Sequence, residues 1–170
     1  MILRLQKPLP VPPSGGDLPG ITIRPFEPDD FDAWATLRDA ALAGLVAGGR
    51  PWTREDFDRE FAASRVWVAV PAAPLPRLVG TIALGRAGRP PDDYSTLQWL
   101  MVDPAFRRRG IGRALVAVVE RAAWDLGERR LTLETHSNWR DAREFYGQLG
   151  YAPVERPAGP ATDDPQRNNR

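Results

Sequence analysis

The sequence predicts a single α/β domain, in the sense of an α+β mixed sheet, with the element order β-α-α-β-β-β-α-β-α-β. Two helical patterns in succession follow the first strand of this series, and a hairpin pattern follows them. A strand is then joined through a helix to a further strand, which places these two strands parallel by the right-handed crossover rule. The 170 residues suffice for one domain with a buried core.

The first half of this domain is expected to contain one strand and two helices. Alternating apolar residues predict a strand that begins at Ile21 and stops at two prolines. Asp29 or Asp30 can cap the first helix, which a group of glycines ends. Thr53 and Asp56 resemble a capping box at the start of the second helix. One face of the first helix holds Phe31, Trp34, Leu37, Ala41 and Leu45.

The second half is expected to begin with an antiparallel hairpin. Its strands lie at 66–70 and 78–84, with a turn at 71–76 between them and a loop at 85–93 after them. The helix that begins near Ile111 is expected to end at a Gly127 C-cap. The other elements are strands at 94–102, 131–136 and 151–154 and a helix at 139–149.

A basic, glycine-containing turn joins the 94–102 strand to the next helix. Glycine lacks a β-carbon, so an anion can approach the free amides at the helix start, where the helix dipole is positive. Guanidinium groups add charge-assisted bonds. The turn therefore predicts a phosphate site, although a basic surface turn without a ligand would have the same composition. Its residues are Arg107, Arg108, Arg109, Gly110, Gly112 and Arg113.

Composition excludes several classes of function. The formal net charge of +1 argues against a broad nucleic-acid or membrane surface. There is no cysteine, which excludes disulfides, thiolate catalysis and cysteine zinc sites, and the single histidine, His136, excludes a histidine-rich metal site. No apolar run approaches the ~18 residues of a membrane span, and no signal-peptide pattern begins the chain. We therefore expect a cytoplasmic protein with no bound metal.

The chain divides into three parts. Residues 1–20 are an apolar N-terminal segment and a Pro/Gly-rich linker, residues 21–155 form the domain, and residues 156–170 are expected to be a disordered tail.

Two spaced motifs carry a resemblance to a known family. The first is Arg107-x-x-Gly110-x-Gly112 between a strand and a helix, and the second is Ala142-x-x-Phe145-Tyr146-x-x-Leu149-Gly150-Tyr151. Over about residues 20–155 the chain resembles the GNAT (GCN5-related N-acetyltransferase) superfamily. The resemblance implies transfer of the acetyl group of acetyl-CoA to a primary amine of a small molecule or peptide, by direct attack in a ternary complex.

The resemblance also implies where acetyl-CoA binds. The sheet should splay open between the 94–102 and 131–136 strands, where the backbone of Leu100, Met101 and Val102 would pair with the pantetheine arm. Amides from Arg107 to Arg113 would hold the pyrophosphate, and no metal is needed.

The resemblance implies that Tyr146 protonates the departing thiolate, unless it is simply an aromatic residue of the core. Many relatives carry a glutamate at the position of Gln98, whose amide cannot accept a proton. Glu134 could act as a base through water or could pair with an arginine, and His136 could act as a base or be an ordinary polar residue.

The lack of an evident base bears on the acceptor. Deprotonation at pH 7 costs ~4.6 kcal/mol for a lysine-type amine and only ~1.4 kcal/mol for an α-amine, which favours an α-amine or another weakly basic amine as the acceptor.

Two further departures from the family concern Asn138 and the chain ends. Trp139 stands at the spacing of the family's asparagine, so Asn138 one residue earlier could cap the last helix and still reach the cofactor, or could only cap the helix. No pattern remains for the family's last strand, and residues 1–6 are expected to fill its position in their own chain or in that of a homodimer partner, unless they form a disordered leader. The linker that joins residues 1–6 to the domain could span ~45 Å if extended.

In the family, the two early helices and the loop between them normally select the acceptor. Their arginines could attract an acidic acceptor or could simply form a solvated face. Their candidate residues are Trp34, Arg38, Arg50, Trp52 and Arg54. A different class of function is also open, namely a catalytically silent module that binds acyl-CoA as a sensor or partner domain.

Overall fold

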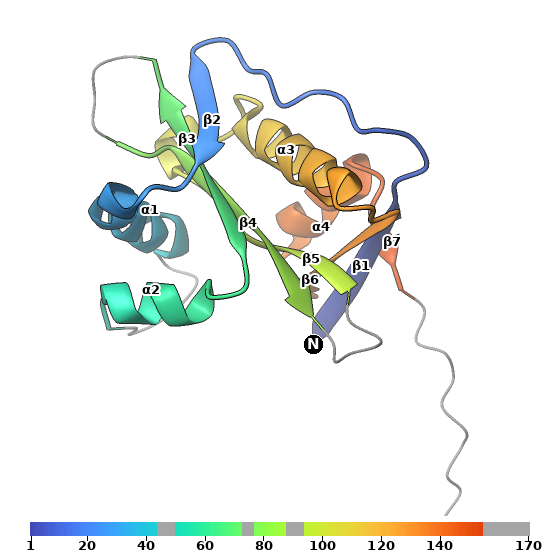
Figure 1. Cartoon of the computed structure of the whole chain (residues 1–170). Coiled ribbons are helices and arrows are strands. Elements are labelled where there is room, and N and C mark those ends of the chain that lie inside the picture. Colours follow the sequence, from blue (N-terminus) through green and yellow to red (C-terminus); the bar gives the residue numbers. More distant parts are fainter. Residues whose placement is uncertain (44–49, 73–76, 88–93, 155–170) are drawn as a thin grey trace, which may run out of the picture.

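A seven-stranded mixed sheet organises the computed structural model, which describes residues 1–43, 50–72, 77–87 and 94–154. The strands lie in the order β2-β3-β4-β5-β6-β1-β7 (Figure 1). The strands are β1 (Ile2–Pro8), β2 (Ile21–Pro25), β3 (Arg65–Pro71), β4 (Gly80–Ala87), β5 (Tyr94–Val102), β6 (Arg130–His136) and β7 (Ala152–Pro153). The helices are α1 (Phe31–Leu42), α2 (Arg54–Glu60), α3 (Ile111–Asp125) and α4 (Arg140–Gln148), with short 3-10 turns at Pro28–Asp30 and Pro104–Phe106.

Helices cover both faces of the sheet because the strand residues alternate between two apolar clusters. In β3, Trp67 and Ala69 pack with α3, whereas Val68 between them packs with α1 and α2. α1 and α2 accordingly lie on one side of the sheet and α3 on the other (Figure 1). The first helix buries Trp34, Leu37 and Ala41 of its predicted face.

The parallel pairing of β5 with β6 is short. It comprises only Thr96 with Thr132 and Leu97 with Leu133, after which the two strands diverge. The remaining residues of β5 stay paired with β4 through Val102. The predicted splay between these two central strands is therefore present.

The N-terminal segment lies inside the sheet of its own chain. β1 pairs antiparallel with β6 along its whole length, and Leu5 and Gln6 pair with β7 on the other side. Lys7 Nζ donates to both carboxylate oxygens of Glu120 in α3, at 2.8 and 2.9 Å. The linker then runs along α3, where a β-carbon on Gly16 would lie 2.9 Å from a Val118 methyl (Figure 1).

The structure differs from the expected elements at three points. β4 continues to Ala87, because residues 85–87 of the expected loop pair with the start of β5. Leu126, the C-cap residue of α3, is exposed although it continues the apolar helical spacing of Ile111, Leu115 and Ala122 in the sequence. Asp30 is the N-cap residue of α1 as expected, but its side chain makes no cap bond to the helix and instead accepts a hydrogen bond from the Glu27 amide, which closes the 3-10 turn.

Several expected features lie outside the described residues. They are Leu45 and the glycines at 44, 48 and 49, most of the turn at 71–76, most of the loop at 85–93, and the tail at 156–170.

Candidate active site

A β-bulge interrupts β5 just after it leaves β6. Pairing passes from Ala83 with Gln98 to Thr81 with Met101, so Trp99 and Leu100 stand opposite one residue of β4. Trp99 has a φ of 53°, in the left-handed region that a bulky side chain rarely adopts. The bulge redirects the Trp99 side chain at the point where the two central strands separate.

The basic turn presents free amides at the start of α3. Gly110 is the N-cap with a φ of 83°, which glycine adopts without steric cost. The Ala114 amide makes the first helical bond, to the Gly110 carbonyl, so the amides of Ile111, Gly112 and Arg113 have no partner within the helix. The turn thus combines unpaired donors with the positive end of a helix of 15 residues.

The arginines of the turn keep their charge available. Arg107 donates to the carbonyl oxygens of Val102 and Ala41, each at 3.4 Å, and Arg109 lies 4.9 Å from the centre of the Phe106 ring. Within the described ranges, neither of them nor Arg108 or Arg113 forms an ion pair with a carboxylate. An anion can therefore bind here without displacing an existing ion pair.

Asp103 fixes the beginning of the turn. Burial would raise the pKa of this carboxyl, but hydrogen bonds from Arg77 and the Ala105 amide, together with the positive charges of Arg77 and Arg107, hold the pKa below its usual range. The carboxylate stays ionised at neutral pH and anchors the strand end from which the basic turn departs.

Tyr146 lies in the core beside α3, with its ring 5.3 Å from that of Phe145 and 5.8 Å from that of Tyr151. The residue is 8% exposed. Burial raises the pKa of its phenol well above the usual value of about 10. Tyr146 is therefore held in the protonated form, which can donate but does not accept a proton.

A cavity of about 270 Å³ opens where β5 and β6 separate. Glu134 lines it, and Arg4 of β1 forms an ion pair with this carboxylate at 3.1 Å. The Arg4 guanidinium also lies 5.1 Å from the centre of the Tyr94 ring. The lining residues are Glu60, Ala87, Tyr94, Thr96, Leu97, Gln98, Trp99 and Glu134.

No sequence pattern indicates that Glu60 and Trp99 meet in this cavity. The Trp99 indole N–H donates to the Glu60 carboxylate at 2.9 Å. Glu60 is the last residue of α2, 39 positions earlier in the chain. Only the packing of α2 on the sheet brings them together, and no local pattern could have predicted it.

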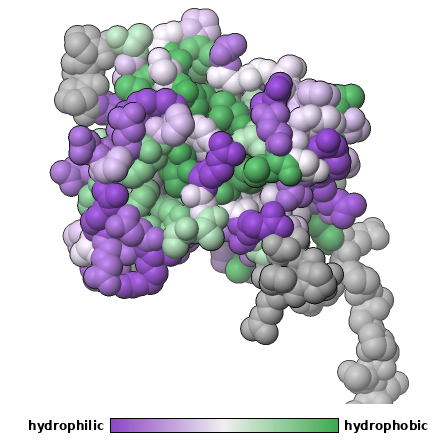
Figure 2. All heavy atoms as spheres, viewed as in Figure 1, coloured by the Kyte–Doolittle hydropathy of each residue, from purple (hydrophilic) through white to green (hydrophobic). Residues whose placement is uncertain are grey.

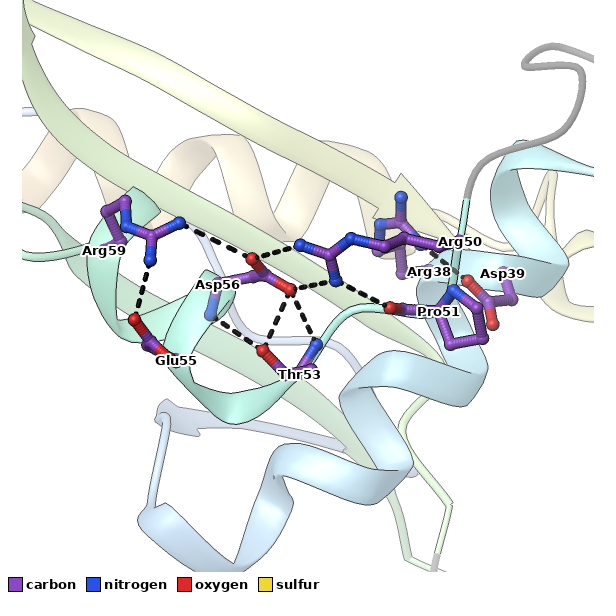
Figure 3. A network of polar contacts seen from close by, with 8 residues as sticks. All are labelled: Arg38, Asp39, Arg50, Pro51, Thr53, Glu55, Asp56 and Arg59. Atoms are coloured by element: carbon purple, nitrogen blue, oxygen red, sulfur yellow. Dashed lines mark hydrogen bonds and ion pairs between the residues drawn. The ribbon is translucent and has the colours of Figure 1, made fainter.

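The arginines of the early helices are paired with carboxylates. Arg50 makes two bonds to Asp56, at 2.6 and 2.7 Å, and Arg38 donates to Asp39 at 2.7 Å (Figure 3). Arg54 bonds its own i,i+4 partner, Asp58. Hydrophilic side chains cover the outer surface of α2 (Figure 2). These arginines form a surface network and do not converge on a bound anion.

Comparison with known proteins identifies the family. The model of the acetyltransferase (GNAT) family matches residues 28–151. The chain belongs to the GNAT family. Acetyl-CoA is the co-substrate that this family generally uses, and the diverging strands, the glycine N-cap and the unpaired arginines of the turn fit an anionic, extended ligand of this kind.

Two curated relatives are similar over part of their length. An uncharacterized protein of Mycobacterium leprae is 31% identical over 150 residues, which are 88% of this chain and 39% of that protein. The N-alpha-acetyltransferase RimI of Mycobacterium tuberculosis is 38% identical over 74 residues, which are 44% of this chain and 46% of that protein. The chain spans less than half the length of these two curated relatives.

Solved structures share the fold. A GCN5-related N-acetyltransferase from Sphaerobacter thermophilus superposes with a TM-score of 0.70 at 22% identity, over 90% of this chain and 48% of that one. Glucosamine-6-phosphate N-acetyltransferase from Arabidopsis thaliana gives a TM-score of 0.62 at 18% identity, over 84% and 99% of the two chains. At these identities the likeness concerns the GNAT fold alone.

The structure brings some of the expected GNAT site residues together and separates others. Leu100 and Val102 pack in the apolar cluster that contains α3, whereas Met101 packs in the cluster on the other face of the sheet, with α1 and α2. Glu134 lines the cavity at the bulge, whereas Tyr146 is not among its lining residues.

The capping role expected for Asn138 is wrong. Trp139 is the N-cap of α4, without a side-chain cap bond, and the Asn138 side chain accepts a hydrogen bond from Ser137 instead. The turn after β6 closes through the backbone, from the Trp139 amide to the His136 carbonyl, so the helix starts one residue later than the cap required. Asn138 is exposed at the end of the splay.

No described helix is long and apolar enough to cross a membrane.

Proposed function

We propose that this GNAT domain transfers the acetyl group of acetyl-CoA to a primary amine of a small molecule or peptide. The divergence of β5 from β6 after two residue pairs carries the proposal, because it leaves one side of β5 open and leads directly into the basic turn. An extended ligand with a pyrophosphate matches both features.

Particular residues would hold this co-substrate. The backbone from Leu100 to Val102 offers hydrogen bonds on the side that faces β6, and the amides from Arg107 to Arg113 offer donors for the pyrophosphate. Asn138 stands at the opposite side of the splay. When bound, acetyl-CoA supplies the activated acetyl thioester, and the chain's own task is to orient the acceptor and to move protons.

Tyr146 and Glu134 have distinct proton tasks in this proposal. The protonated phenol of Tyr146 donates to the departing thiolate. Glu134, which pairs with Arg4 at 3.1 Å, orders the water that carries the proton of the amine to solvent. The amide of Gln98, which also lines the cavity, can accept a hydrogen bond but not a proton.

The acceptor is proposed to be an α-amine or a similarly weakly basic amine. Without a strong base in the cavity, the neutral amine must form from solvent equilibrium, which costs ~1.4 kcal/mol for an α-amine and ~4.6 kcal/mol for a lysine-type amine at pH 7. The M. tuberculosis relative is an N-alpha-acetyltransferase, which agrees with this choice.

Calorimetry and thiol release together test the proposal. Acetyl-CoA should bind with 1:1 stoichiometry, and free thiol should appear only when an amine is added. Turnover should fall along a panel of amines of increasing pKa, so that peptide α-amines exceed ε-amines in kcat/KM by at least tenfold. Equal or faster reaction of ε-amines would contradict the α-amine assignment. Tight acetyl-CoA binding without thiol release for any amine would instead favour a silent acyl-CoA-binding module.

A further inference from the structure

The cavity at the bulge contains two carboxylates with different surroundings. Glu134 is neutralised by Arg4, whose guanidinium donates to it at 3.1 Å. Glu60 accepts one hydrogen bond, from the neutral indole of Trp99 at 2.9 Å, and has no cationic partner among the described residues. Both carboxylates are exposed, and among the described residues only that of Glu134 has an ion-pair partner.

The position of Glu60 is fixed from two sides. It ends α2, whose capping box at Thr53 sets the helix start. Its partner Trp99 is held by aromatic contacts, with ring centroids 5.0 Å from Trp52 and 5.9 Å from Phe61. A carboxylate held by a single neutral donor in this way retains lone pairs for a further donor.

The charges around Glu60 do not supply that further donor. Glu60 also lines a second pocket beside α2, together with Arg38, Arg50 and Arg59. Arg50 and Arg59 bond Asp56 and Glu55, and Arg38 bonds Asp39 and stacks 4.7 Å from the Trp52 ring (Figure 3). Each of these three arginines thus has a carboxylate partner other than Glu60, although the buried Nε–H of Arg38 has no hydrogen-bond partner among the described residues.

A carboxylate is poorly suited to bind the amine that reacts. A negative charge beside an ammonium raises the pKa of that ammonium and so lowers the fraction of neutral amine. The same carboxylate is well suited to bind a second cation of the acceptor, which does not have to lose its proton. The indole face of Trp99 beside it can add a cation–π contact.

We infer that Glu60, positioned by Trp99, binds a cationic group of the acceptor that is separate from the amine to be acetylated. The acceptor class is thus an amine that carries an additional ammonium or guanidinium group, such as a peptide with a basic side chain next to its α-amine. The inference rests on the proposed acetyl transfer for the identity of the cavity as the acceptor site.

The test compares two probes that differ in one charge. Alanyl-lysine amide and alanyl-norleucine amide share an α-amine and a similar side-chain length, but only the first carries the additional cation. Their binding is followed by the NMR resonance of the Trp99 indole N–H, assigned with a Trp99→Phe variant. The wild-type protein should bind the lysine probe about tenfold more tightly, which is the weak end of a charge-assisted bond.

Two carboxylate variants of α2 separate a local effect from a change in overall charge. Glu60→Gln should abolish the preference for the lysine probe. Asp58→Asn removes an equal charge from an exposed position of the same helix, where its partner Arg54 does not line either pocket, and should retain the preference. Equal binding of both probes by the wild-type protein, or a preference that survives in Glu60→Gln, would overturn the inference.

Thiol release with the same probes distinguishes this inference from the proposed function. Selective binding of the lysine probe without any acetyl transfer would contradict the proposed function and leave the role of Glu60 intact. Transfer to both probes at equal kcat/KM, with equal binding, would contradict the role of Glu60 and leave acetyl transfer intact.

Discussion

At the scale of single residues, Tyr146 combines burial with the proton-donor role proposed for it. Its phenol is removed from solvent, and burial raises its pKa, so the proton stays on the oxygen throughout the neutral and mildly alkaline range. Such a group can serve as an acid over the whole range in which an amine becomes neutral. The rate should therefore rise with pH as the acceptor loses its proton, without a fall below pH about 10 caused by Tyr146.

Tyr146→Phe tests this role. Removing the phenol oxygen should lower kcat about 100-fold, the low end of general acid catalysis, and should change acetyl-CoA affinity less than threefold. Tyr151→Phe removes a phenol oxygen from the same core cluster and should leave kcat within about threefold of wild type. Steady-state thiol release and calorimetry measure both quantities. A Tyr146→Phe variant that keeps wild-type kcat would assign this residue to packing alone.

At the scale of elements, α3 is bounded by two glycines in the left-handed region. Gly110 at its start has a φ of 83° and Gly127 after its end a φ of 88°. Alanine at either position should cost about 1 kcal/mol of stability, because a β-carbon clashes in this conformation. Only Gly110 lies among the amides of the basic turn.

This symmetry gives a matched pair of variants. Gly110→Ala and Gly127→Ala should lower the free energy of unfolding in urea by similar amounts. Gly110→Ala alone should weaken acetyl-CoA binding, by about tenfold, because its methyl group obstructs the approach of an anion to the turn. Equal acetyl-CoA affinity in the two variants would show that the pyrophosphate does not approach α3 at Gly110.

The elements also show which features the sequence can predict. The capping box at Thr53 and the strand-to-helix turn at Gly110 are local, and both were predicted and are confirmed. The contact of Trp99 with Glu60 depends on a bulge and on the docking of α2, so no sequence spacing indicates it. The capping prediction for Asn138 failed because this residue lies inside a turn that closes through the backbone from Trp139 to His136, so α4 begins one residue later.

At the scale of the whole molecule, the sheet depends on a strand from the beginning of the chain. β1 lies between β6 and β7, which are otherwise joined only through α4. It contributes Leu5, which is 4% exposed, and the ammonium of Lys7, which pairs with the 5% exposed Glu120. β1 also supplies Arg4 to the cavity, so the same strand supports both the core and the charge balance of the proposed acceptor site.

Lys7→Met isolates the buried charge from the strand itself. Loss of the ammonium leaves Glu120 buried without a cation, which should lower the free energy of unfolding by ~2 kcal/mol. This value is smaller than for a fully buried pair because Lys7 is partly exposed. Arg121→Met breaks the exposed pair with Asp125 on the same helix and should lower the free energy of unfolding by less than ~0.5 kcal/mol.

Deleting residues 1–8 removes the Lys7–Glu120 pair, the buried Leu5 side chain and the hydrogen bonds of β1 to β6 and β7. The melting temperature should therefore fall by more than about 10 °C. An unchanged melting temperature of the deletion variant would show that β1 is not an integral strand, because no sheet of this size loses an interior strand without loss of stability.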